Sequence, residues 1–510
     1  MEATVSRAEY DELKAQNEVL RHELAELKRL IFGAKSERFL PTAGAPEQMA
    51  LWQGNGSRDE DAPPRKPTKE INGYERRKAK QKPHPGRTPL PDHLPVREVL
   101  LEPEQNTTGM VEIGRDVTRK VDYTPGKLEV IEYVRPRYAR PQAEQSEGAS
   151  PAVIQAPAPD QVLPKAIAGA GLLTQLAIAK FIDHLPLYRQ RAMLGRDFDW
   201  NIPSSTLGDW FAATCALLDP LYAALEKQVL ATDYLQGDES RLTVLERGGE
   251  ATKNKSHRYP PKAGKVHLGY MWVFRNPVAG GVVFVYRPGR GANILHETLA
   301  DFTGHLQSDG YSAYTSFMKS HPGVKLVSCL AHIRRKFFDA RANHRELAEQ
   351  ALRAIQYLYR IEDICRRYEL APDRRRRLRQ RYARPAYCAL LDWVGEQRRT
   401  NLSKGGIGKA LTYAYNHLPR LAAYLDDGRI EIDNNLIENK IRPLALGRKN
   451  YLFAGSRQGA RRAAMMYSFF GSCREAGINE REWLHDVLLR IGSHPINRIE
   501  ELLPGRWVKK

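Results

Sequence analysis

The sequence predicts a multidomain α/β protein, and three observations support this fold class. The chain has 510 residues, which is too long for one hydrophobic core and long enough for three or more compact units. Near the N-terminus a heptad pattern predicts a helix that pairs with a second helix. Between residues 236 and 342 the apolar periodicity predicts three strands, a helix and a fourth strand, in that order.

The composition favours a polyanionic partner, of which nucleic acid is the natural candidate. Lys and Arg number 79 against 60 Asp and Glu, which gives a net charge of +19 and a pI near 9.6. A basic enzyme with a solvated positive surface is the alternative. The five cysteines include no C-x-x-C pair, and the chain has neither a secretory signal nor a run of about 18 apolar residues. These features predict a cytoplasmic protein with no membrane partner.

Residues 1–40 are predicted to form a coiled coil like a leucine zipper. Because two Asn side chains at an a position bond each other across the seam, Asn17 favours a parallel dimer. An amphipathic helix that docks on its own chain is the alternative. The residues predicted to form the seam are Leu13, Asn17, Leu20, Leu24 and Leu27.

Two linkers and a small β module follow. Residues 41–95 are rich in Pro, Gly and positive charge, which predicts a basic linker that either tracks DNA phosphates or is simply solvated. Residues 96–142 alternate β-branched and polar types around Pro125 and Gly126, which predicts a small β module. Residues 143–164 are rich in Pro and Ala and are predicted to be a second linker.

Residues 165–235 are predicted to be helical and to contain a helix-turn-helix. A helix over 187–195 is followed by a turn and by a second helix, for which Ser204 or Ser205 is the expected N-cap. A helix that begins with small polar residues suits the major groove of DNA, although helix pairs without DNA are also common. The residues predicted to bind DNA here are Arg189, Ser204, Ser205 and Thr206.

Residues 236–450 are predicted to form a catalytic domain whose strand order is ribonuclease-H-like (retroviral-integrase-like), with a helical insertion over 343–428. Asp238 lies near the first strand, Asp309 closes the fourth, and Glu438 lies on a later helix, so the sheet can bring the three together. Three carboxylates suit two divalent ions, Mg²⁺ or Mn²⁺, that cleave a phosphodiester. Any one of them alone is more often a solvated surface charge.

Asp238 has rivals in Glu239 and Asp233. Asp238 is preferred because it shares the two-residue period of Leu242 and Val244, which predicts that Glu239 faces the opposite side of the strand.

Basic residues and a histidine accompany the acidic ones. Arg442 follows Glu438 by one helical turn, and it is predicted either to bind DNA phosphate or to form an ordinary surface ion pair. Residues 324–329 are predicted to form a fifth strand and residues 331–340 a helix. His332 and Arg335 follow this fifth strand, where His332 is either a DNA or carboxylate contact or a structural histidine. The residues predicted to bind DNA here are His332, Arg335, Arg442, Arg448 and Lys449. Residues 451–510 are predicted to form a C-terminal helical region.

From about residue 85 to 490 the chain resembles the transposases of the insertion sequence 66 family. The motifs that carry the resemblance are Leu185-Pro186-Leu187-Tyr188-Arg189-Gln190 with Ser205-Thr206-Leu207 and Trp210, Gly237-Asp238-Glu239-Ser240, Ser308-Asp309-Gly310-Tyr311, Cys329-Leu330-Ala331-His332 with Arg334-Arg335-Lys336-Phe337, and Asp433-Asn434-Asn435 with Glu438-Asn439, Arg442-Pro443 and Arg448-Lys449-Asn450. The resemblance implies an acidic-triad (DDE) catalytic domain, a leucine-zipper-like N-terminus and binding to terminal inverted repeats.

The chain departs from the family pattern at two places. Family members usually carry a four-cysteine zinc module, whereas residues 100–142 contain no cysteine, so we predict no zinc there. Ser240 stands where Thr is usual after the acidic pair, which preserves a hydroxyl.

The sequence thus predicts a DNA transposase that cleaves inverted-repeat ends and transfers the strands into target DNA, with Asp238, Asp309 and Glu438 as catalytic residues and metal ligands. The expected partners are terminal-repeat and target DNA, further copies of the chain in a homodimer or higher oligomer, and accessory proteins of the same element. The expected location is the bacterial cytoplasm, on the nucleoid. The alternatives are a catalytically silent DNA-binding repressor or architectural protein, and a nuclease without strand transfer.

Overall fold

The computed structural model describes residues 126–128, 130–131, 137–139, 153–155, 161–164, 166–245 and 266–509. The predicted coiled coil, with Leu13, Asn17, Leu20, Leu24 and Leu27, and the basic linker lie outside these residues, as does most of the predicted β module. The helices and strands described below belong to one compact unit. Among the described residues, every helix is too short or too polar to span a bilayer.

A short antiparallel pair precedes the helical part of the chain. β1 (Arg137–Ala139) pairs with β2 (Val153–Gln155), with Tyr138 opposite Ile154. β2 falls inside the range that was predicted to be a Pro/Ala-rich linker, so part of that range continues the β structure.

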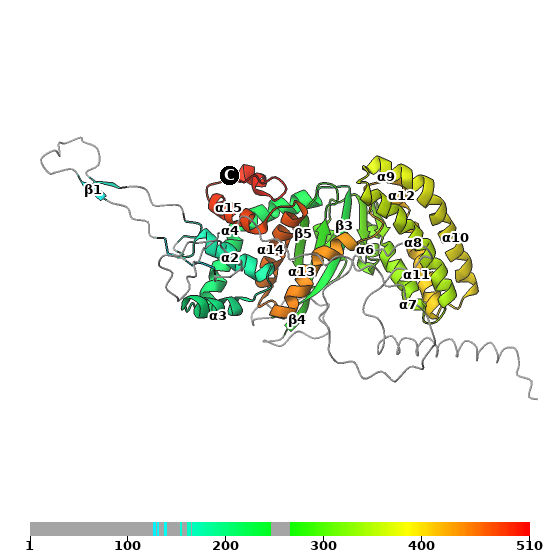
Figure 1. Ribbon diagram of the computed structural model, residues 1–510, viewed down its shortest axis with the longest axis horizontal. Coiled ribbons are helices and arrows are strands. Elements are labelled where there is room, and N and C mark those ends of the chain that lie inside the picture. The colour runs from blue at the N-terminus through cyan, green and yellow to red at the C-terminus, as the bar shows by residue number, and fades with distance from the viewer. Residues whose placement is uncertain are drawn as a thin grey trace, which may run out of the picture. The chain divides into compact units, whose positions relative to one another are not determined.

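A five-stranded mixed sheet forms the centre of the fold (Figure 1). Its strand order is β5-β4-β3-β6-β7, in which β3 pairs antiparallel with β4 and parallel with β6. The strands are β3 (Tyr234–Leu245), β4 (Val266–Arg275), β5 (Val282–Arg287), β6 (Gly304–Ser308) and β7 (Val324–Ser328), with α5 (Asn293–Thr298) before β6 and α6 (Ser312–Ser320) after it. The order of elements predicted from the apolar periodicity is confirmed.

In the described part of the chain, three helices precede the sheet, namely α2 (Ala170–Phe181), α3 (Leu187–Phe198) and α4 (Ser204–Leu230). The expectation that Ser204 or Ser205 caps α4 is wrong. The N-cap is Pro203, which makes no side-chain hydrogen bond, so both serines lie within the first helical turn. α4 is 27 residues long and packs into the core through residues such as Leu218 and Leu221. Its first turn therefore carries the exposed Ser204 and Ser205, while much of the helix is structural.

The predicted insertion is helical and has a core of its own, next to the β7 side of the sheet (Figure 1). At its centre Arg379 and Glu362, both fully buried, form an ion pair of 2.7 Å. Arg379 Nη1 also donates to the carbonyls of Tyr424, Asp427 and Ile430. The helices of the insertion are α8 (Arg345–Arg367), α9 (Pro372–Leu378), the π-helix η2 (Arg379–Ala383), α10 (Arg384–Thr400), α11 (Gly406–Leu421) and α12 (Ala423–Asp426). α7 (Leu330–Ala340) precedes the insertion and packs against α8 and α11.

The C-terminal helices complete the sheet layer. α13 (Asn435–Tyr451) runs beside β3, and it is followed by α14 (Arg457–Glu475), α15 (Glu480–Arg490) and the 3₁₀ helix η3 (Ile496–Leu502). α14 covers the edge strand β5, where the Ser472 hydroxyl accepts from the Val282 N–H at 2.9 Å and donates to its carbonyl at 3.0 Å. Hydroxyls on α14 therefore satisfy backbone groups that an edge strand leaves unpaired.

Candidate active site

The predicted carboxylates lie beside the end of β6, where its pairing with β3 stops. One oxygen from each of Asp238, Glu239 and Asp309 lies within 4.8 Å of the others. β3 pairs in parallel with β6 over residues 234–236 and then continues, so Asp238 lies in the middle of β3, two residues beyond that pairing, while Asp309 directly follows β6. Glu438, in the first turn of α13, is close enough for its charge to raise the pKa of Asp238. Two neighbouring strands thus bring three carboxylates together, and α13 places Glu438 near them.

These carboxylates are partly withdrawn from water and repel one another. Burial, followed by the charges of Glu239 and Asp309, raises the pKa of Asp238 well above its usual value. Burial and the neighbouring Asp433 likewise raise the pKa of Glu438, although the Arg335 guanidinium opposes this shift. A bound cation would offset both the repulsion and the loss of solvent.

Glu239 lies on the other face of β3 from Asp238, as the two-residue period predicted. Its strand partner Trp272 packs on Tyr314 of α6, and a Cβ on Gly237 would meet the same tyrosine. The Glu239 side chain is 1% exposed and accepts a hydrogen bond from Arg290 Nε at 2.8 Å and from the Tyr314 hydroxyl at 3.2 Å. Glu239 is therefore held in a structural ion pair.

The loop that carries Asp309 is fixed from both sides. Asp309 Oδ1 accepts from the Tyr311 N–H at 2.9 Å, and the Asp309 carbonyl accepts from the Tyr413 hydroxyl at 3.0 Å. Gly310 has a φ of +91°, and a Cβ there would lie 2.6 Å from Cε1 of His417. A side chain at position 310 would therefore meet both backbone strain and a steric clash.

Tyr413 and His417 belong to α11 of the insertion, and both were missed from the sequence. Their rings stack with centroids 4.1 Å apart, and His417 Nδ1 lies 3.2 Å from the Ser328 hydroxyl at the end of β7. Burial, with the nearby Arg420, lowers the pKa of His417 to about 4, so the ring is neutral at physiological pH. Their four-residue spacing on one helix face is the sole sequence signal that they act together.

The Asp433-Asn434-Asn435 motif connects the helix of Glu438 to the rest of the site. Asn434 is fully buried, and its side-chain Nδ2 donates to the Gly237 carbonyl at 3.1 Å. Its backbone N–H donates to Cys329 Sγ at 3.2 Å. Asp433 accepts from the Tyr359 hydroxyl of α8 at 2.9 Å and from the Asn435 side chain at 2.9 Å. The start of α13 is thereby bonded to β3, to the end of β7 and to the insertion.

His332 and Arg335 lie beside Glu438, as their predicted place after the fifth strand implied. Ligand atoms of Cys329, His332 and Glu438 lie within 4.8 Å of one another, and the charge of Arg335 opposes the rise in the pKa of Glu438. Burial raises the pKa of the Cys329 thiol, which keeps this sulfur protonated.

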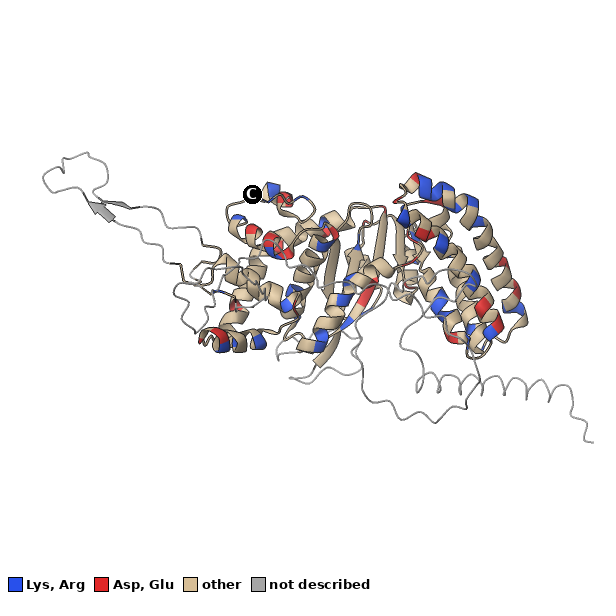
Figure 2. Ribbon diagram, viewed as in Figure 1, with Lys and Arg blue, Asp and Glu red and all other residues tan. Residues whose placement is uncertain are grey.

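Several of the predicted DNA-binding residues gather along α13, where Lys and Arg are visible in Figure 2. Arg448 Nη1 donates to the Ser240 hydroxyl at 3.0 Å and to the Arg241 carbonyl at 2.7 Å. Arg442 and Lys449 are exposed and share the face of Glu438, because they follow it by about one and three helical turns. Arg189 of α3 donates a hydrogen bond from Nη1 to Asn450 Oδ1, near the end of α13, at 3.4 Å. Ser204, Ser205 and Thr206 lie apart from this row, at the start of α4.

Family comparison agrees with this arrangement. Residues 165–462 match the family described as "Transposase IS66 family". The chain belongs to the IS66 family of transposases. Outside that range, residues 19–99 of this IS66-family protein match "Transposase C of IS166 homeodomain" and residues 468–504 match "IS66 C-terminal element". The family predicted from the sequence motifs is confirmed.

Two relatives of this IS66-family protein come from Sinorhizobium fredii (strain NBRC 101917 / NGR234), and both are described as uncharacterized. The protein y4jD is 32% identical over 513 residues, which cover 96% of this chain and 94% of the relative. The protein y4qI is 32% identical over 458 residues, which cover 86% of this chain and 80% of the relative.

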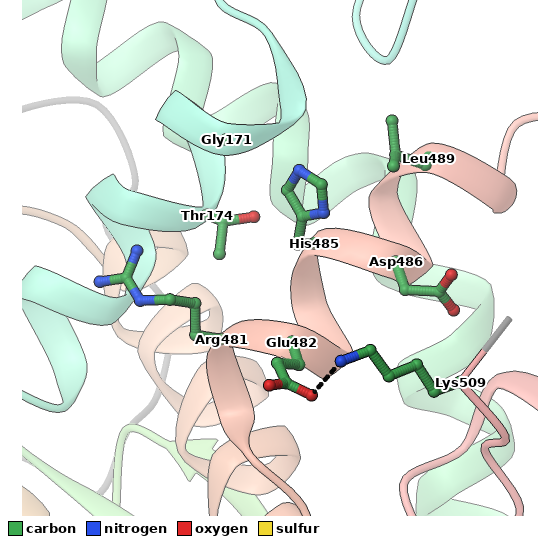
Figure 3. A pocket seen from close by; sticks show the side chains of 8 residues that line it. All are labelled: Gly171, Thr174, Arg481, Glu482, His485, Asp486, Leu489 and Lys509. Atoms are coloured by element: carbon green, nitrogen blue, oxygen red, sulfur yellow. Dashed lines mark hydrogen bonds and ion pairs between the residues drawn. The ribbon is translucent and has the colours of Figure 1, made fainter. Parts of the chain in front are cut away.

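A further hollow of about 430 Å³ in this IS66-family protein lies between α2 and α15 (Figure 3). Charged side chains that line it are already bonded: Lys509 pairs with Glu482 at 2.9 Å, and Asp486 pairs with Arg490, outside the lining, at 2.7 Å. None of the carboxylates described above lines it. The candidate active site is therefore the carboxylate group beside the end of β6.

Proposed function

We propose that this chain is a DNA transposase that cleaves the DNA at the inverted-repeat ends of a mobile element and transfers the freed 3′ ends into target DNA. The observation that carries the proposal is the close approach of Asp238 and Asp309, with Glu438 near enough to raise the pKa of Asp238, in a chain of the IS66 family. The three have the residue types that two-metal phosphodiester chemistry requires.

The cofactors we propose are two divalent ions, Mg²⁺ or Mn²⁺, with Asp238, Asp309 and Glu438 as ligands. Hard cations prefer carboxylate oxygens, and the cluster holds these in a partly buried place where their charges repel. When bound, such ions activate the attacking oxygen and stabilise the leaving one. Glu239 is an unfavourable ligand because its carboxylate already binds Arg290 and Tyr314.

The fold that we propose for the catalytic part is ribonuclease-H-like. The strand order β5-β4-β3-β6-β7 supports it, since three antiparallel strands are followed by two parallel ones. In this fold the chain itself has two tasks at the site. The hydrogen bonds of Tyr413 and Tyr311 hold the Asp309 loop, and those of Asn434 hold α13, so that the carboxylates are preorganised before DNA binds.

DNA is the proposed partner, and the basic residues around the carboxylates support this. Arg335, Arg442 and Lys449 lie where a phosphate next to the carboxylates would be neutralised. Binding of the helix-turn-helix region to the inverted repeats, through Ser204, Ser205 and Thr206, remains a proposal. So do assembly through the N-terminal zipper, help from accessory proteins and action at the nucleoid.

Labelled inverted-repeat DNA, incubated with the protein and Mg²⁺ or Mn²⁺, tests the function. We expect cleavage at the ends and joining to target DNA. Cleavage without joining would indicate a nuclease, and binding without cleavage would indicate a repressor or architectural protein.

Alanine substitutions test the site. Asp238→Ala, Asp309→Ala and Glu438→Ala should each abolish cleavage and leave binding of the ends unchanged. Asp301→Ala, at an exposed acidic residue of the same domain, is the matched control and should cleave normally. Normal cleavage by any of the three variants would remove that residue from the proposed triad.

A further inference from the structure

A polar groove leads away from the carboxylates along β3. Its volume is about 400 Å³, and Glu239, beside Asp238, lines its inner end. Ser240, Arg241 and Thr243 continue the same wall, and Arg448 and Leu452 form the wall that belongs to α13 and the residue after it. We call this the β3–α13 groove. Because β3 rises by about 3.3 Å per residue, Thr243 lies roughly 17 Å beyond Asp238.

The inner wall of the β3–α13 groove offers groups that bind phosphate. Both hydrogen bonds of Arg448 use Nη1, to the Ser240 hydroxyl and the Arg241 carbonyl, and these bonds fix the direction of the guanidinium. Within the described part of the chain, Nε and Nη2 of Arg448 make no hydrogen bond, so both can donate to an anion. Arg241 itself is exposed.

Leu452, which lines the groove, and Phe453, the residue after it, are both exposed apolar side chains. Leu452 is 67% exposed and Phe453 is 42% exposed, whereas their neighbour Tyr451 points inward to the Tyr467 hydroxyl. Water therefore surrounds a leucine and a phenylalanine that stand next to each other. Burial of these two side chains would lower the free energy of the protein in water. Their exposure therefore indicates that a partner covers them.

The backbone holds these two side chains outward. Leu452 has a φ of +61°, a conformation that a residue with a Cβ disfavours. The next residues are pinned to β3, because the Ala454 N–H donates to the Thr243 carbonyl at 2.8 Å and the Leu245 N–H donates to the Ala454 carbonyl at 2.9 Å. The backbone therefore fixes Leu452 and Phe453 near the end of the groove that is farther from the candidate catalytic carboxylates. Arg241 and Arg448 line the groove between these two ends.

A DNA strand that enters the site would match the three features described above, which are the polar groove, its arginines and the exposed apolar side chains. Its backbone would follow the groove, where Arg448 and Arg241 supply positive charge. At the outer end its bases would meet Phe453 and Leu452, and apolar side chains of this kind unstack bases by insertion or by stacking on them.

We propose that the β3–α13 groove binds the DNA strand next to the scissile phosphate, and that Leu452 and Phe453 unstack one of its bases. The proposal rests on the function proposed above and adds to it a subsite and an unpaired base in the substrate.

Duplexes from the ends of the element, with 2-aminopurine at each of the positions within about five nucleotides of the cleavage site, test the proposal. Binding is measured in Ca²⁺, so that the fluorescence does not depend on cleavage. We expect wild-type protein to raise the fluorescence at one position, because unstacking relieves quenching. Phe453→Ala and Leu452→Gly should abolish this rise, and they should slow cleavage in Mg²⁺ by about tenfold or more, the scale of one lost base-stacking contact.

Two controls separate a lost DNA contact from a damaged fold. Glycine relieves the strained backbone at position 452, so Leu452→Gly should unfold no more easily than wild type. Leu489→Ala, at an exposed leucine of α15, should change neither fluorescence nor cleavage. An abasic site or mismatch at the fluorescent position should restore cleavage by Phe453→Ala.

The outcomes also separate the two proposals. A wild-type protein that cleaves the ends but raises fluorescence at none of the positions would overturn the base-unstacking proposal alone. Wild-type cleavage rates in both Phe453→Ala and Leu452→Gly would do the same. A protein that raises the fluorescence but cleaves in neither Mg²⁺ nor Mn²⁺ would overturn the proposed function and leave the subsite supported.

Discussion

The side-chain amide of Asn434 donates to the Gly237 carbonyl at 3.1 Å, which bonds the start of the Glu438 helix to the strand of Asp238. Asn434 is fully buried, and its backbone N–H is also bonded, to Cys329. The distance between Asp238 and Glu438 is therefore controlled by a residue that carries no charge and makes no direct contact with DNA phosphate in the proposed mechanism.

Asn434→Ala should slow cleavage more than it weakens DNA binding. Loss of the bond to Gly237 frees the start of α13, and displacement of a reacting group by about 1 Å costs roughly 100-fold in rate. Single-turnover cleavage and a gel-shift titration measure the two effects. Asn439→Ala, at an exposed position on the same helix, is the control and should behave as wild type. Equal losses of binding and rate in Asn434→Ala would contradict a positioning role.

Asp238→Asn and Glu239→Gln should differ in metal binding. Asp238→Asn should lose bound Mn²⁺, measured by calorimetry, whereas Glu239→Gln should keep it. The Glu239 carboxylate is buried against Arg290, so its neutralisation should instead lower the free energy of unfolding by about 1–3 kcal/mol. If Glu239→Gln lost Mn²⁺ as fully as Asp238→Asn, the assignment of Glu239 to a structural ion pair would be wrong.

Gly310→Ala should destabilise the protein by about 1–3 kcal/mol, because alanine disfavours the +91° φ found there. The added Cβ would also approach His417, so His417→Ala in the same chain should recover the steric part of the loss and leave the backbone part. Thermal unfolding of both variants measures this. The control is Gly492→Ala, where a Cβ would meet open space. If Gly310→Ala and Gly492→Ala unfolded at the same temperature, the Asp309 loop would be able to adapt to the added side chain.

Lys180→Met should stabilise the fold at pH 7 and lose this advantage at higher pH. Burial lowers the pKa of Lys180 to about 8. The charged form is therefore disfavoured in the folded state, and this penalty is complete below pH 8 and disappears as the pH rises toward 10.5. The gain at pH 7 should be no more than about 3 kcal/mol.

Denaturant titrations at pH 7 and pH 10 measure the effect of Lys180→Met. Lys227→Met, at an exposed lysine of α4, is the matched control for the loss of a lysine side chain. A gain from Lys180→Met that is the same at both values would mean that the ammonium group is well solvated in the folded protein.

Much of the fold was predictable because it depends on local pattern. Apolar alternation predicted the strands β4, β5, β6 and β7, and helical periodicity predicted that the insertion is helical. The first residue of a helix can depend on a single capping interaction, and such helix ends were less predictable. Both candidate caps of α4 proved to lie inside the helix, because the helix begins directly after Pro203.

The sequence by itself determined the family and the order of the sheet strands along the chain, and it named three acidic candidates, since these follow from residue type, spacing and motif. The tertiary structure alone decided what surrounds the candidates. Two-residue parity predicted the face of β3 on which Glu239 lies, but not that Arg290 and Tyr314 bind its carboxylate there. Tyr413 and Asn434 bond to residues that lie about 100 and 200 positions earlier in the chain. No local pattern encodes such contacts, because they form only when the sheet and the insertion pack together.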